Sequence, residues 1–167
     1  LRGIYEPFNR LRKIVGFDTF DGFPNVSSKD AGLSEGMYST APDYARFLAQ
    51  ILELQEQESP LPHIKKHEIV QGDASVTIRE YLDRNPQTII AMAYFDLDIY
   101  KPTRDCLLAI RDRLTQGSVI GFDELNDQVC PGETAALKEV LGLSRFSIRR
   151  FGPSARTSYL VVDGPLN

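Results

Sequence analysis

Four short apolar runs that end in acidic residues alternate along this chain with stretches of helical periodicity. The runs cover residues 12–18 (RKIVGFD), 67–73 (HEIVQGD), 88–98 (TIIAMAYFDLD) and 118–124 (SVIGFDE). Their length and apolar content are typical of buried strands. Apolar residues recur every third or fourth position, as in amphipathic helices, at about residues 44–58, 75–84, 102–116 and 133–141. This alternation predicts an α/β fold around an open, mostly parallel sheet.

The two last apolar runs, residues 146–152 and 158–163, are too close together for a parallel connection. The segment GPSAR at residues 152–156 joins them, whereas parallel neighbours need a crossover of about a dozen residues or more. We therefore expect a C-terminal antiparallel hairpin. A chain of 167 residues has the size of one domain, so residues 1–167 are predicted to form a single domain.

Composition argues against several classes of protein. The chain has 19 Lys and Arg against 23 Asp and Glu, and no block of basic residues offers a footprint for nucleic acid. No apolar run reaches the length that crosses a membrane. The two cysteines, Cys106 and Cys130, are too few for a disulfide framework, so a reducing cytoplasm is the expected location.

Acidic residues stand where the predicted parallel strands end, and ligands of open α/β sheets bind outside these carboxyl ends. Asp96 and Asp98 lie two residues apart, hence on one side of their strand, and Asp123 and Glu124 end the next strand. Because neighbouring strands are about 5 Å apart, these like charges would raise one another's pKa unless a cation neutralises them. The pattern predicts a site for Mg²⁺, Ca²⁺ or Mn²⁺, which prefer oxygen ligands.

Each acidic residue alone also has an ordinary explanation. Solvated acids are common at strand ends, and only the two pairs taken together favour a cation site. Asp18 could accept hydrogen bonds from the hydroxyls of a nucleoside ribose, and Asp73 could meet an adenine amine. Asp73 fits equally well as the N-cap of the helix that follows it.

Three further segments are candidates for a functional role. Residues 19–39 form a long loop with several glycines, typical of a lid or a mobile segment. Residues 63–67 (HIKKH) hold two histidines at the spacing of helical metal ligands, but Pro60 and Pro62 disfavour a helix, so a solvated loop is predicted. The arginines of the terminal hairpin, among them Arg156, could bind a phosphate or carboxylate, although an exposed charged face is the preferred interpretation.

Five motifs in a fixed order resemble those of the macrocin-type O-methyltransferases. They are GFDTFDGFP (residues 16–24), GDASVTI (72–78), FDLDIYKPT (95–103), GSVIGFDELN (117–126) and PGET (131–134). Enzymes of this family transfer a methyl group from S-adenosylmethionine to sugar hydroxyls of macrolides, aminocoumarins and surface glycans. The resemblance runs through nearly the whole chain. It implies a Rossmann-like methyltransferase sheet and the same activity, with a sugar or glycoside as the small-molecule acceptor.

The resemblance also implies a metal site and a catalytic base. Family members hold a divalent metal, usually Mg²⁺, with the first Asp of the D-x-D motif and the acid pair after the next strand. These positions correspond to Asp96, Asp123 and Glu124. Glu124 stands where Asp is common, so its longer side chain would change the geometry of the site. The second Asp of D-x-D is the family's general base, which corresponds to Asp98.

Contacts to S-adenosylmethionine are implied in the same way. The acid that ends the second strand of the family's sheet binds the cofactor ribose and corresponds to Asp18. The acid after the third strand lies at the adenine and corresponds to Asp73. Their neighbours Thr19, Phe20 and Ala74 are expected to line the same cofactor site.

One part of the family pattern is missing from the sequence. In that family a first strand and a glycine-rich loop, which meets the methionine part of the cofactor, precede the GFDTF segment. Residues 1–11 (LRGIYEPFNRL) supply neither, and resemble the end of the helix that follows this loop. We therefore expect a truncated domain whose sheet lacks its first strand.

A non-catalytic function is the alternative hypothesis. Receiver-like α/β modules also gather acids at one rim of a sheet, where they bind Mg²⁺ or a nucleoside in a regulatory role. The long loop at residues 19–39 and the terminal hairpin favour the methyltransferase over such a module. Homo-oligomers are compatible with either function.

Overall fold

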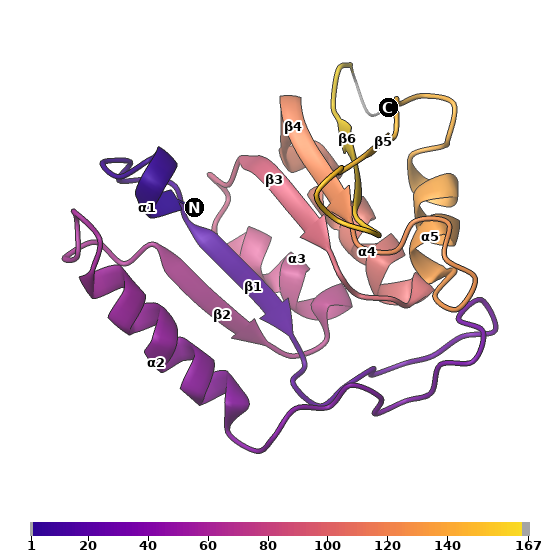
Figure 1. Cartoon of the computed structure of the whole chain (residues 1–167), viewed down its shortest axis with the longest axis horizontal. Helices are drawn as coiled ribbons and strands as arrows, with labels where there is room; N and C mark the ends of the chain where they lie inside the picture. The colour runs from indigo at the N-terminus through magenta and orange to yellow at the C-terminus, as the bar shows by residue number, and fades with distance from the viewer. Residues whose placement is uncertain (1, 165–167) are drawn as a thin grey trace.

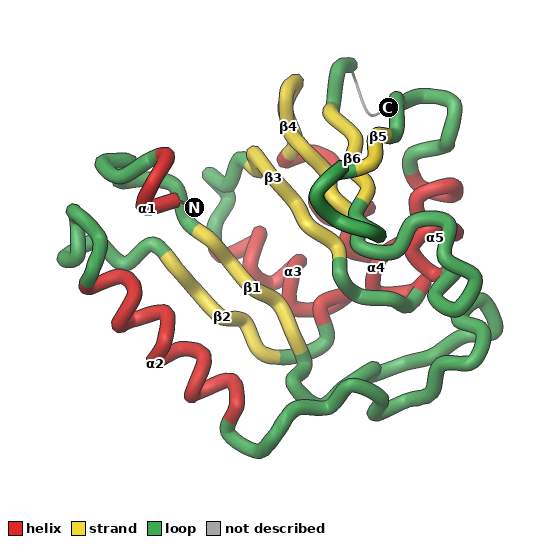
Figure 2. Tube along the Cα trace, viewed as in Figure 1, coloured by secondary structure: helices red, strands yellow, loops and turns green. Residues whose placement is uncertain are grey.

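The computed structural model describes residues 2–164, in which strands and helices alternate as predicted (Figures 1 and 2). In chain order the elements are α1 (Arg2–Tyr5), β1 (Ile14–Asp18), α2 (Tyr44–Gln57), β2 (His67–Gln71), α3 (Ala74–Arg84), β3 (Ile90–Phe95), α4 (Tyr100–Ile110), a 3₁₀ turn (Arg111–Arg113), β4 (Leu114–Phe122), α5 (Gly132–Val140), β5 (Arg149–Arg150) and β6 (Ser158–Val161). Among these residues, no helix has the length and apolar character of a membrane span.

The strands form two separate groups. Strand β1 pairs with β2 in parallel, and the second group has the order β3-β4-β6-β5. Strands β3 and β4 are parallel, whereas β4, β6 and β5 pair in antiparallel fashion. The predicted α/β fold with a C-terminal antiparallel hairpin is confirmed, although β5 is only two residues long.

The apolar core lies between the β3-β4-β6 group and the helices α3, α4 and α5, of which α3 and α4 lie behind the strands in Figure 1. Phe95 of β3 and Phe122 of β4 are register partners whose rings stack with centroids 5.3 Å apart. Both side chains are buried, and burying a Phe contributes roughly 1.5–3 kcal/mol to folding. The Asp123 amide continues the pairing with a 3.0 Å hydrogen bond to the Phe95 carbonyl. The core therefore fixes the two strand ends at which the acid pairs begin.

Strand β2 begins at a buried ion pair, which corrects the predicted solvated loop at residues 63–67. Lys66 Nζ lies 2.9 Å from Glu56 Oε1, and both side chains are at most 2% exposed. The adjacent His67 ring is also buried, with Nδ1 3.3 Å from Glu56 Oε2. The prediction was wrong for Lys66 and His67 because helix α2 brings Glu56 over the start of β2, a tertiary contact that local sequence does not reveal.

Strands β1 and β3 each have one unpaired edge within the described part of the chain. The two strands point in the same direction in Figure 1. Their outward apolar side chains include Ile14, Met92 and Tyr94, which are 58%, 63% and 48% exposed. Unpaired strand edges with apolar side chains are templates for pairing with another chain.

We therefore expect residues 1–167 alone to self-associate, and Met92→Lys to reduce this association because a charge on an edge strand opposes pairing. Val76→Lys is the matched control, since Val76 is an exposed apolar residue of helix α3. Light scattering over a concentration series measures the effect. A monodisperse monomer at every concentration, or equal effects of the two substitutions, would contradict this expectation.

Candidate functional site

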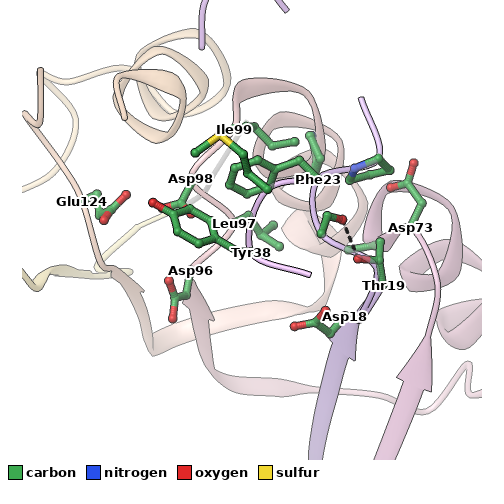
Figure 3. A pocket seen from close by; sticks show the side chains of 15 residues that line it. Asp18, Thr19, Phe23, Tyr38, Asp73, Asp96, Leu97, Asp98, Ile99 and Glu124 are labelled. Atoms are coloured by element: carbon green, nitrogen blue, oxygen red, sulfur yellow. Dashed lines mark hydrogen bonds between the residues drawn. The ribbon is translucent and has the colours of Figure 1, made fainter. Parts of the chain in front are cut away.

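A cavity of about 340 Å³ opens at the carboxyl ends of β1, β2, β3 and β4. Figure 3 shows Asp96, Asp98 and Glu124 toward one end of it and Asp18 and Asp73 toward the other. The segment after β1 supplies much of the apolar wall. The complete lining is Asp18, Thr19, Gly22, Phe23, Pro24, Met37, Tyr38, Asp73, Ala74, Asp96, Leu97, Asp98, Ile99, Pro102 and Glu124. Seven of the nine residues predicted from the sequence thus share one cavity.

Asp98 and Glu124 form the buried end of this site. One oxygen of each carboxylate and the Cys130 sulfur lie within 4.8 Å of one another. Glu124 is 7% exposed, and its Oε1 is 2.5 Å from Arg156 Nη2. Its other oxygen, Oε2, is buried and has no hydrogen-bond partner among the described residues. A buried carboxylate oxygen without a donor favours the approach of a proton or a cation.

The surroundings of Asp98 favour its protonated form. Burial and the neighbouring Glu124 carboxylate raise the pKa of Asp98 to about 8. A proton on Asp98 would be shared with Glu124 and satisfy the otherwise unpaired oxygen. Asp98 also has a positive φ of 57°, a conformation that Asp tolerates better than most residues. The site therefore holds a carboxyl group that can bind or release a proton near neutral pH.

Glu133, in the PGET motif, ties the two acid-bearing loops together. Its carboxylate is fully buried and accepts hydrogen bonds from the Leu97 amide at 3.3 Å and the Glu124 amide at 3.2 Å. Burial raises the pKa of Glu133 to about 7, although the two amide donors oppose this shift. No role for this residue could be predicted from the sequence, because its two partners become neighbours only in the folded chain.

The predicted metal ligands are only partly assembled. Asp96 and Glu124 line the cavity, and burial together with the Asp123 charge raises the pKa of Asp96. The Asp123 carboxylate instead accepts hydrogen bonds from Tyr94 Oη at 2.6 Å and Thr157 Oγ1 at 3.3 Å. The Asp98 and Glu124 carboxylates, with a Glu124 oxygen unpartnered among the described residues and Asp96 on the same cavity wall, nevertheless offer the oxygen ligands that a hard divalent cation prefers.

Cys130 lies beside the acids of this site. Burial and the nearby Glu124 carboxylate raise the pKa of its thiol to about 12. The thiol therefore stays protonated at neutral pH, and a neutral thiol is a poor ligand for Mg²⁺. The carboxylates, and not the Cys130 thiol, are therefore the groups that can bind a cation here.

Four of the five predicted cofactor residues line the cavity, with Asp18 and Asp73 at its opposite end. Asp18 Oδ1 accepts a 2.7 Å hydrogen bond from the Phe20 amide. Asp73 Oδ1 accepts hydrogen bonds from the amide and hydroxyl of Ser75, so Asp73 does cap helix α3, as one of the two hypotheses held. Thr19 Oγ1 donates to the Gly22 carbonyl at 2.6 Å (Figure 3).

Phe20, expected at the cofactor site, lies away from the cavity. Its side chain is buried and packs against Tyr44 of α2, with ring centroids 6.2 Å apart. Its φ of 62° turns the chain sharply after β1 and directs the ring toward α2. Phe23, Met37 and Tyr38 line the cavity in its place, and the sequence indicated only that their segment is a lid or a mobile loop.

Comparison with solved structures finds extensive similarity to methyltransferases. The crystal structure of CalS11, a calicheamicin methyltransferase, matches with a TM-score of 0.92 and 43% identity over 96% of this chain and 64% of that chain. An apo structure of CalS11, named there as TDP-rhamnose 3'-O-methyltransferase, matches with a TM-score of 0.82 and 40% identity over 96% and 62%. This chain has a Rossmann-like methyltransferase fold.

The O-methyltransferase NovP has the same fold, with a TM-score of 0.68 and 15% identity over 92% of this chain and 61% of NovP. The chain spans less than two thirds of the length of each of these proteins. No protein-family model and no curated protein sequence matches it. These findings support the predicted resemblance to sugar O-methyltransferases, but not to the macrocin type in particular.

We expect the cation-free protein to lose stability as the pH rises from about 4 to 8. The folded-state pKa of Asp98, about 8, lies above its value in an unfolded chain, about 3.9. The bound proton therefore stabilises the fold fully below pH of about 4, and this contribution is lost as pH rises through about 8. Mg²⁺ should raise the unfolding temperature more at a pH of about 8.5, above the Asp98 pKa, than at a pH of about 6, below it. At the lower pH, protons compete with the cation for the carboxylate.

Thermal unfolding in chelator and in Mg²⁺ measures both effects. Asp98→Asn should flatten the pH dependence, because the amide does not titrate and still tolerates a positive φ. Asp112→Asn is the control, since this aspartate has an 88% exposed side chain. If the Asp98→Asn protein had the same pH profile as the unsubstituted chain, Asp98 would not be the group that causes the pH dependence.

Proposed function

We propose that this chain forms the catalytic site of an S-adenosylmethionine-dependent O-methyltransferase that acts on a hydroxyl of a sugar or a related polyol. The observation that carries the proposal is the shared cavity, which places Asp18 and Asp73 at one end and Asp98 and Glu124 at the other. The 43% identity to CalS11 supports the same activity. We further propose that the protein is cytoplasmic, that it forms homo-oligomers and that its activity is of the macrocin type.

Asp98 is the proposed general base. An alkyl hydroxyl is a weak nucleophile, and a carboxylate near it removes its proton as the oxygen attacks the methyl carbon. The pKa of about 8 makes Asp98 a stronger proton acceptor than an ordinary carboxylate. Its partial burial keeps competing water away from the oxygen that accepts the proton.

Asp96, Asp123 and Glu124 are the proposed ligands of a divalent cation, Mg²⁺ in the first instance. When bound, this cation would lower the pKa of the acceptor hydroxyl, and S-adenosylmethionine would supply the methyl group. Arg156 neutralises part of the Glu124 charge from the solvent side. Glu133 holds the Leu97 and Glu124 amides and thereby sets the spacing of the acid-bearing loops.

Asp18 and Asp73 are the proposed contacts of the adenosine half of the cofactor. Asp18 would accept hydrogen bonds from the ribose hydroxyls through the oxygen that the Phe20 amide leaves available. Asp73 uses Oδ1 to cap α3, so its second oxygen is the one proposed to meet the adenine amine. Thr19 and Ala74 complete this end of the cavity wall.

Methyl transfer from S-adenosylmethionine to TDP-rhamnose, the sugar nucleotide in the name of CalS11, is a direct first assay. We expect activity with Mg²⁺ and none in chelator, measured by mass spectrometry of the sugar nucleotide. Asp98→Asn should lower kcat about 10²-fold or more while S-adenosylhomocysteine still binds. Asp123→Asn should weaken Mg²⁺ binding instead, and Asp112→Asn should change neither.

Two outcomes would count against this mechanism. Full methyl transfer in chelator, with Asp98→Asn and Asp123→Asn unaffected, would remove the proposed base and cation. Binding of Mg²⁺ or S-adenosylmethionine without methyl transfer to any of a panel of sugars would favour the alternative, a non-catalytic regulatory module.

A further inference from the structure

Residues 19–43, called the lid here, connect β1 to α2 and cover part of the cavity. In Figure 1 the lid runs far from the end of β1 before it returns to α2. Phe23 and Met37 join its two arms, since the Phe23 amide donates to the Met37 carbonyl at 3.1 Å. Beside this contact, Pro24 and Tyr38 contribute to the cavity wall. The position of the lid therefore decides how enclosed the site is.

The far turn of the lid is held by one buried carboxylate. Asp30 is 1% exposed. Its Oδ2 accepts hydrogen bonds from the Ser27 amide at 2.8 Å and the Ser27 hydroxyl at 2.6 Å. Its Oδ1 accepts a 2.5 Å hydrogen bond from the amide of Tyr100, the first residue of α4. Asp30 thus caps a helix that lies 70 residues further along the chain.

Helix α4 has no polar cap of its own at this end. Its N-cap residue is Ile99, whose apolar side chain cannot accept a hydrogen bond. A carboxylate at a helix N-terminus satisfies an orphan amide and interacts favourably with the helix dipole. The capped amide follows Asp98 by two residues, so the Asp30 contact lies next to the proposed general base.

Gly132 closes this junction from a third side. A Cβ atom at Gly132 would lie 2.6 Å from Asp30 Oδ1 and 2.6 Å from the Asp98 carbonyl oxygen, and closer still to the Tyr100 nitrogen. The lid, the Asp98 turn and the start of α5 therefore meet where a single methyl group does not fit. This close packing holds Asp98 at its positive φ, a conformation that costs energy for a residue other than glycine.

Exposed contacts accompany the buried one. Lys29 Nζ lies 3.6 Å from the centre of the Tyr100 ring and 3.3 Å from Glu139 Oε2. Both charged side chains of the Lys29 and Glu139 pair are more than 40% exposed, and such pairs contribute little. The Asp30 carboxylate, which is buried and accepts three hydrogen bonds, is the contact that holds the lid.

We propose that Asp30 is a positioning residue that latches the lid over the site and keeps Asp98 in its left-handed conformation. The catalytic part of this role rests on the proposed function. The mechanical part does not, because it concerns the lid and the α4 terminus alone. Loss of the latch should open the lid and displace Asp98 without changing the cofactor contacts at Asp18 and Asp73.

Hydrogen exchange of residues 1–167 tests the mechanical part. Asp30→Ala and Gly132→Ala should each speed exchange of lid amides about tenfold, while exchange in helix α3 stays unchanged. Gly132→Ala leaves the lid sequence intact, so tryptic cleavage after Lys29 should also accelerate about tenfold in that variant. The controls are Glu35→Ala, an exposed acid of the lid, and Gly152→Ala, where a Cβ meets open space.

Methyl-transfer kinetics test the catalytic part. Both latch variants should lower kcat about tenfold, with KM for S-adenosylmethionine within about twofold of the unsubstituted chain. Asp30→Asn keeps an oxygen for the Tyr100 amide and should restore kcat to within about threefold. Unchanged lid exchange in both variants, or faster exchange throughout the core, would overturn the latch. Faster lid exchange with unchanged kcat would overturn the catalytic role, and if the unsubstituted chain transfers no methyl group, lid exchange alone decides.

Discussion

The parallel pairing of β3 with β4 is the contact on which the site depends. Phe95 and Phe122 stack in register, and the Asp123 amide extends the ladder to the Phe95 carbonyl. Each strand then continues directly into its acid pair, so the pairing forces like charges together. Apolar burial in the core offsets this repulsion, while the fully buried Glu133 fixes the loops through two amides. Because the fold holds these carboxylates close together, they bind protons or cations more strongly than separate carboxylates would.

Much of the architecture could be predicted because strands and helices each have a characteristic spacing of apolar residues along the sequence. Asp96, Asp98 and Glu124 follow the ends of β3 and β4 and line one cavity, because the carboxyl ends of parallel neighbours lie at the same edge of a sheet. Periodicity does not give side-chain direction at irregular backbone, and Phe20 and Asp123 lie off the cavity for that reason. The roles assigned to these residues stay predictions.

Contacts between distant segments could not be predicted in this way. The partners of Lys66 and Asp30 lie on elements that local sequence does not place nearby. Composition suggests that each charged residue is solvated, since Lys and Asp are rarely buried unless paired. Lys66 is buried because the Glu56 carboxylate compensates for the lost water, and Asp30 is buried because the amide at the start of helix α4 does so. Arg156 lies on the exposed face where it was expected, with a 50% exposed side chain, but its pairing with Glu124 and Asp127 depends on the fold and could not be predicted.

The site lies across two halves of the described structure. The β1-β2 pair carries Asp18 and leads into Asp73, whereas the β3-β4 pair leads into Asp98 and Glu124. No strand hydrogen bonds join the two pairs within residues 2–164. Helix α3 bridges them from one side, packing Tyr81 against Phe17 of β1 and its apolar face against α4. The lid bridges them at the cavity, because it begins directly after Asp18 and is anchored beside Asp98 by Asp30. The distance from Asp18 and Asp73 to the proposed base is thus set by helix packing and one buried carboxylate.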